Sequence, residues 1–129
     1  MILTQEIAVA AIRTVTLTMS PLLRDLIIKL VAGRVDLDVV EELDTRDGLE
    51  ERLWGADPDL ILIGLRRNEA DEIGVSFVRL LPNAKVIAFS HDGRHAFVYR
   101  MHSQRTELLD VSAQTLVDTI LRLRRPNGN

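Results

Sequence analysis

Apolar and polar residues alternate along the chain in short segments that predict strands and helices by turns. Residues 13–18 form a β-branched run typical of a strand, and residues 59–63 form the most continuous apolar run, bounded by Pro58 and Gly64. A run of this kind suits a strand that is buried on both faces, as in a parallel sheet. Further strands are predicted, the last of them weak, at residues 35–40, 85–89 and 107–109.

Apolar residues at helical spacing separate these strands. Ser20 and Pro21 are typical of a helix N-cap and a first-turn proline, and the positions that follow predict a helix up to Gly33. The remaining helices are predicted from Asp44 or Thr45 to Gly55, around Phe77 up to Pro82, over residues 91–102 and after Ser112.

A strand followed by a helix, repeated along the chain, predicts an α/β fold. Parallel neighbouring strands need crossover helices, which pack on both faces of the sheet. We therefore expect a doubly wound, five-stranded parallel sheet with the strand order 2-1-3-4-5. Binding sites in such sheets lie at the carboxyl ends of the strands, so the loops after Thr18, Gly64 and Ser90 should meet there.

Composition narrows the class of protein. A length of 129 residues predicts one domain over residues 1–129, with a core at about 12–123 and flexible ends. The absence of cysteine excludes disulfides, a thiol nucleophile and a cysteine-ligated metal. The net charge of −3 does not favour nucleic acid or an anionic membrane as a partner. The chain has no long apolar run and no basic segment before one, so we expect no membrane span, no signal peptide and a cytoplasmic location.

Four segments spread along the chain carry a resemblance to a known family. They are residues 12–25, which end in SPLLRD, residues 58–66 (PDLILIGLR), residues 83–90 (NAKVIAFS) and residues 108–112 (LLDVS). In this order they resemble the opening, the third strand with its following loop, the fourth strand and the fifth strand of response-regulator receiver domains, in particular receivers of the LuxR/NarL type that are joined to a helix-turn-helix domain. The resemblance spans roughly residues 12–123 and implies a flavodoxin-like receiver fold and a role in bacterial two-component signal transduction.

The resemblance also assigns the phosphorylation site, position by position. A working receiver needs an aspartate that captures the phosphoryl group, two acids that hold Mg²⁺, a lysine and a hydroxyl. The chain has Gly64 in place of the aspartate, Thr18 and Met19 in place of the acids, Leu109 in place of the lysine, and Ser90 for the hydroxyl. Only Ser90 keeps the required chemistry. The resemblance therefore implies a degenerate receiver that is not an enzyme, has no catalytic residue, and holds neither a metal nor a cofactor.

A receiver without its phosphorylation site still has surfaces that other proteins can bind. We therefore expect a phosphorylation-independent interaction or signalling module whose partner is a protein, a second copy of the chain being one candidate. The segment from Ser90 to Leu109 is a few residues shorter than in typical receivers, so the partner should bind this reshaped segment and the last helix. The candidate interaction face comprises His95, Tyr99, Arg100, Arg105, Asp118 and Arg122.

The main alternative is a small-ligand sensor. A glycine at position 64 would open a small pocket among Thr18, Met19, Gly64 and Ser90, neutral and partly apolar where a receiver is acidic. Gly64 as an ordinary turn residue is the simpler interpretation of this position.

The histidines allow two further alternatives, both disfavoured. His91, His95 and His102 could bind zinc if they lay along one helix face, but no acid completes a ligand set. Ser90 and His91 could act as nucleophile and base, but no third group is evident to orient the histidine.

Overall fold

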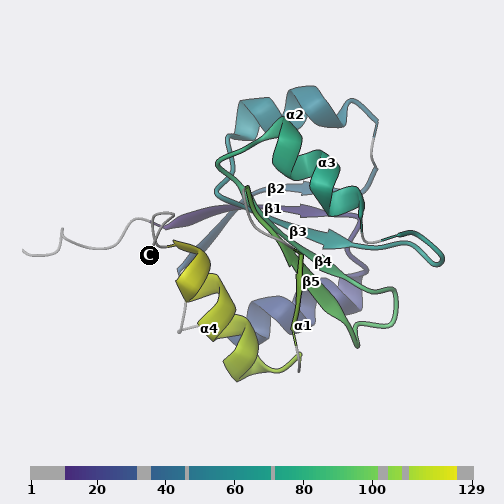
Figure 1. The fold of residues 1–129 in the computed structure, drawn as a ribbon, viewed down its shortest axis with the longest axis vertical. Coiled ribbons are helices and arrows are strands. Elements are labelled where there is room, and N and C mark those ends of the chain that lie inside the picture. Colours follow the sequence, from purple (N-terminus) through teal and green to yellow (C-terminus); the bar gives the residue numbers. More distant parts are fainter. Residues whose placement is uncertain are drawn as a thin grey trace, which may run out of the picture.

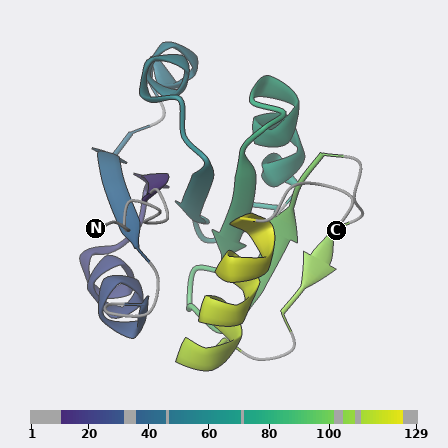
Figure 2. The ribbon, with the colours of Figure 1, turned by 90° about the vertical axis from the view of Figure 1, so that its left-hand side faces the viewer.

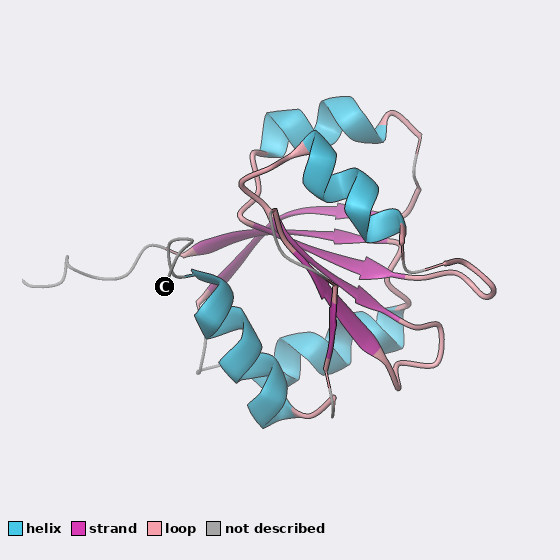
Figure 3. Cartoon of the chain, viewed as in Figure 1, coloured by secondary structure: helices cyan, strands magenta, loops and turns pink. Residues whose placement is uncertain are grey.

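The computed structural model describes residues 11–31, 36–45, 47–70, 72–101, 105–108 and 111–124. These residues form one mixed sheet with helices packed on both of its faces (Figures 1 and 3). The sheet is six-stranded, in the order β2-β1-β3-β4-β5-β6. The predicted α/β class and the order 2-1-3-4 of the first four strands are confirmed. The expected five strands are six, because the strand next to β4 is the unpredicted Ala96–Tyr99, and the strand predicted at residues 107–109 corresponds to β6 at the edge.

The strands are β1 (Ile12–Leu17), β2 (Leu37–Leu43), β3 (Leu60–Gly64), β4 (Lys85–Phe89), β5 (Ala96–Tyr99) and β6 (Thr106–Glu107). The helices in the described part of the chain are α1 (Pro21–Val31), α2 (Leu49–Ala56), α3 (Ile73–Leu80) and α4 (Ala113–Arg124).

Two hydrophobic cores lie on opposite faces of the sheet. One lies under α1 and α4 and includes Leu62, Ile87 and Leu116, and the other lies under α2 and α3 and includes Ile63 and Phe77. Figures 1 and 2 show the two helical layers on either side of the strands. All of β3 is buried, because it lies between β1 and β4 and both of its faces are covered. A strand that is buried on both faces needs apolar side chains at every position, which explains the continuous apolar run of β3.

The expected all-parallel sheet is wrong at one edge. Strands β1 to β4 pair in parallel, but β5 runs antiparallel to β4, and β6 antiparallel to β5. The helix predicted over residues 91–102 is also wrong, because residues 91–94 form a turn and β5 follows. The pair Asp92-Gly93 is the reason: Gly93 has a φ of +74°, a left-handed conformation that suits a hairpin turn.

Two predicted helix N-termini are confirmed by capping hydrogen bonds. At the start of α1, the Leu23 N–H donates to Oγ of Ser20, the residue directly before Pro21, over 3.1 Å. At the start of α4, the Thr115 N–H donates to Ser112 Oγ over 3.2 Å. The other ends differ. Helix α2 begins after Gly48 instead of at Asp44 or Thr45 and ends at Ala56, β2 occupies Leu37–Leu43 instead of residues 35–40, and the last strand is Thr106–Glu107. Gly33, the expected end of the first helix, lies outside the described residues.

Strand β5 is fixed to α3 by one close contact. Tyr99 is buried in the core under α2 and α3, and its ring lies directly against Gly74. A Cβ added at Gly74 would overlap this ring. The helix therefore needs a glycine at this position for β5 to lie where it does.

We predict that Gly74→Ala lowers the free energy of unfolding by about 1–3 kcal/mol, since the added Cβ would overlap the buried Tyr99 ring and force it to shift. Gly55→Ala in α2 is the matched control, because a Cβ there meets no heavy atom within 4 Å. Alanine favours the helix over glycine, so the control should be more stable than the wild type by up to about 1 kcal/mol. Urea unfolding of both variants checks the prediction, and equal stabilisation by both would contradict it.

Candidate functional site

The carboxyl ends of the parallel strands carry a pocket of about 250 Å³. Thr18, Gly64 and Ser90 all line it, so the prediction that the three loops meet is confirmed. Figure 1 shows the loop after β3 and the turn after β4 projecting from the same edge of the sheet. The other lining residues are Ser20, Leu23, Leu65, Arg66, Arg67 and His91.

The two remaining positions that the resemblance assigns are not seen in this pocket. Met19 is half-buried and packs against the core under α1 and α4. Leu109 lies outside the described residues, so the structure does not place the position expected for the lysine. The pocket is therefore built around Thr18, Gly64 and Ser90.

Thr18 and Gly64 hold two strand ends together. Thr18 has a left-handed backbone with a φ of +50°, and its hydroxyl shares its one proton between the carbonyl oxygens of Leu17 and Gly64, each 2.8 Å from Oγ1. Its N–H donates to the Leu43 carbonyl over 2.7 Å. A Cβ added at Gly64 would lie 2.7 Å from the Thr18 carbonyl oxygen and 3.0 Å from Met19 Cα. No side chain, a carboxylate included, can stand at position 64 unless this backbone moves.

Ser90, the position that the resemblance assigns to the hydroxyl, has its side chain engaged in the β4–β5 turn. The hydroxyl donates to Asp92 Oδ1 over 2.7 Å and accepts from the His95 N–H over 3.0 Å. The hydrogen bond from Ser90 lowers the pKa of the Asp92 carboxyl, and a second bond from the Arg94 backbone N–H lowers it further. Asp92 is therefore ionised at neutral pH and holds the turn closed.

The charge around the pocket is positive. Arg66, Arg67 and His91 line it, whereas none of the lining residues that the structure describes carries a carboxylate, the ligand that Mg²⁺ prefers in proteins. Glu69, one of the acidic residues in the β3–α3 loop, is turned to the backbone: its Oε1 accepts from the Arg66 N–H over 2.9 Å. The arrangement suits hydrogen bonding to a ligand that carries negative charge.

The zinc alternative depended on a helix that residues 91–102 do not form. His91 is exposed in the turn, and His95 pairs with Glu107, its Nδ1 lying 3.2 Å from Oε2. His102 lies outside the described residues. Among the residues that the structure describes, no group of three or more histidine, cysteine or acidic side chains could hold a metal ion.

The candidate interaction face is divided by the sheet. Arg100 and Arg122 line a second pocket of about 240 Å³ between β5, β6 and α4. Asp118 is exposed on α4 and accepts a hydrogen bond from Gln114 Nε2 over 2.8 Å. The other lining residues of this pocket are Val98, Thr106, Leu108, Thr119 and Leu123, which sequence reasoning did not single out.

The rest of the candidate face lies on the opposite side of the sheet or is buried. The Arg105 guanidinium lies 5.1 Å from the centre of the Phe97 ring, and Phe97 packs against the core under α2 and α3. His95 pairs with Glu107, which is opposite Phe97 in the strand register. Tyr99 is 5% exposed, so its place on a contact surface is wrong: side chains alternate along β5, and this one points into the core.

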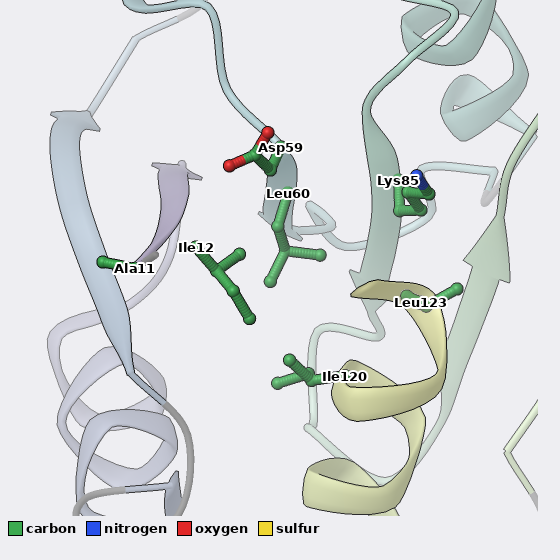
Figure 4. Close-up of a pocket in the computed structure, with 7 residues that line it drawn as sticks. All are labelled: Ala11, Ile12, Asp59, Leu60, Lys85, Ile120 and Leu123. Carbon is green, nitrogen blue, oxygen red and sulfur yellow. The ribbon is translucent and has the colours of Figure 1, made fainter. Parts of the chain in front are cut away.

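A third pocket, of about 230 Å³, lies at the opposite, amino edge of the sheet (Figure 4). Its wall combines apolar side chains with polar groups, and Asp59 and Lys85 are among its lining residues. Asp59 has a structural role there, because its Oδ2 accepts from the Arg13 N–H over 3.0 Å and joins β1 to the start of β3. The apolar lining residues are Ala11, Ile12, Leu60, Ile120 and Leu123.

No protein-family model matches the chain, and no curated protein and no solved structure is significantly similar to it.

None of the helices in the described ranges has the length and the apolar character that crossing a lipid bilayer requires. What the chain does has to be inferred from its own residues.

We predict that Thr18→Val lowers the free energy of unfolding by about 1 kcal/mol, because valine keeps the shape of threonine but loses the hydrogen bond to Gly64. Thr18→Ser is the matched control, since serine keeps the hydroxyl and should lose less. Urea unfolding of the two variants measures the difference. A valine variant at least as stable as the serine variant would show that this hydroxyl does not hold the loop.

Proposed function

We propose that the chain is a receiver-like domain of the flavodoxin-like class that works without phosphorylation and binds a protein in signal transduction. The observation that carries this proposal is the closed position at Gly64, where a Cβ would lie 2.7 Å from the Thr18 carbonyl oxygen. The resemblance puts the phosphoryl-accepting aspartate at this position. The sequence segments that resemble a receiver and the strand order of the sheet support the family assignment.

The partner is proposed to bind at the second pocket, which forms a groove between β5, β6 and α4. Arg100 and Arg122 line this groove, and Asp118 is exposed on the same helix as Arg122. Arginine is enriched at protein interfaces because its planar group combines apolar contact with several hydrogen bonds. His95 and Arg105 form a separate patch on the other face of the sheet.

The second candidate function is a small-ligand sensor. It is favoured by the pocket of about 250 Å³ at the carboxyl edge, which lies where α/β sheets bind their ligands. A sensor of this kind would use the same fold and would also need no phosphorylation.

We predict that the protein gains no phosphoryl group when it is incubated with acetyl phosphate and Mg²⁺. Intact-mass measurement checks this, with a receiver that keeps all its acids treated in parallel as the positive control. A mass gain of one phosphoryl group would overturn the proposed function.

We also predict that Arg122→Glu weakens binding of the partner at least about tenfold, because the reversed charge faces the proposed interface. Arg79→Glu, on α3 at the other face of the sheet, is the matched control and should bind as the wild type does. If the partner is a second copy of the chain, sedimentation measures the self-association. If the partner is another protein, it is first retained from a lysate of the source cells on the immobilised chain, and its binding is then measured by titration. If both variants weaken binding of the partner equally, the groove is not the interface. If the wild-type protein is a monomer and retains no protein from the lysate, the proposed role as an interaction module is rejected.

A further inference from the structure

We propose that the pocket at the carboxyl edge of the sheet binds a compact organic anion, with a phosphate or carboxylate group on an apolar body. This inference rests on the second candidate function, the small-ligand sensor, and names the class of its ligand. It depends on the cations at the pocket, on the positions of the nearby acids, and on the apolar wall beside Gly64.

Two arginines bring positive charge that the described part of the chain does not neutralise. Arg66 and Arg67 follow β3 and line the pocket, and neither is a member of an ion pair among the described residues. An anion bound in the pocket offsets this positive charge, because both arginines line it. The guanidinium fork also matches the oxygen atoms of phosphate and carboxylate, which it binds through paired hydrogen bonds.

Two described acids in the loops that form the pocket, Glu69 and Asp92, point to other partners. Glu69 Oε1 accepts from the Arg66 N–H over 2.9 Å, and Asp92 Oδ1 accepts from Ser90 and from the Arg94 N–H. Neither acid lines the pocket, whereas His91 does and adds a ring N–H donor. An entering ligand therefore meets donors and positive charge, the opposite of the carboxylate cluster that would hold Mg²⁺.

The pocket combines this charge with an apolar wall. Leu23 and Leu65 line it, and Gly64 contributes no side chain to fill it. Ser20 Oγ accepts from the Leu23 N–H, which leaves its own proton to donate to a ligand. The volume of about 250 Å³ lies below the range of roughly 300–1,000 Å³ common for drug-sized ligands, so the ligand is compact.

A set of probes that share a benzene ring tests the charge preference. Phenyl phosphate, benzoate, benzyl alcohol and benzylammonium are titrated at low salt into ¹⁵N-labelled protein, with the amides of Gly64, Leu65 and His91 followed by NMR. At least one of the two anions should shift these amides, and the alcohol and the ammonium should not. Inorganic phosphate alone should bind more weakly than phenyl phosphate, because it makes no contact with the apolar wall.

The double variant Arg66→Gln/Arg67→Gln should weaken anion binding at least about tenfold, since it removes both charged donors. Arg79→Gln is the matched control on α3, outside the pocket, and should leave binding unchanged. Anions that leave the amides unshifted, or that bind the double variant as tightly as the wild type, would overturn the inference. If benzyl alcohol shifts the same amides and the anions do not, the sensor function stands and the anionic ligand class is rejected.

Discussion

The backbone of Thr18 lies so close to Gly64 that no Cβ fits between them, and this contact shapes the carboxyl edge of the sheet. Hydrogen bonds from Thr18 reach the Leu43 carbonyl at the end of β2 and the Gly64 carbonyl at the end of β3. Three neighbouring strands are therefore tied together at one residue. Because α1 begins only a few residues later, the position of Leu23 in the pocket wall follows from the same contact.

The parts of the fold that could be predicted have strong local signals. Strand β3 is an uninterrupted apolar run, and the start of α1 carries both a capping serine and a first-turn proline. The meeting of Thr18, Gly64 and Ser90 could be predicted as well, because parallel strands bring their carboxyl ends to one edge. These positions depend only on the order of the strands and on where each one ends.

The segment after β4 could have been predicted from its own residues. Asp92-Gly93 stands between two apolar runs rich in β-branched and aromatic residues, which is a strong signal for a hairpin. The helix was predicted there because strands and helices alternate along the rest of the chain, and that pattern outweighed the local signal. Other features depend on tertiary contacts and leave no trace in a single sequence, such as the engagement of the Ser90 hydroxyl with Asp92 and the burial of Tyr99 against Gly74.

The antiparallel pairing of β4 and β5 also has a consequence for how the chain folds. The two strands are joined by residues 91–94, whereas the parallel pairing of β3 with β4 encloses the whole segment from Leu65 to Ala84. The entropy lost on closing a loop grows with the logarithm of its length, so the hairpin closes at a cost lower by on the order of 1 kcal/mol. Local contacts of this kind form quickly. The β4–β5 ribbon can therefore form before the crossovers and present a ready edge on which β3 assembles.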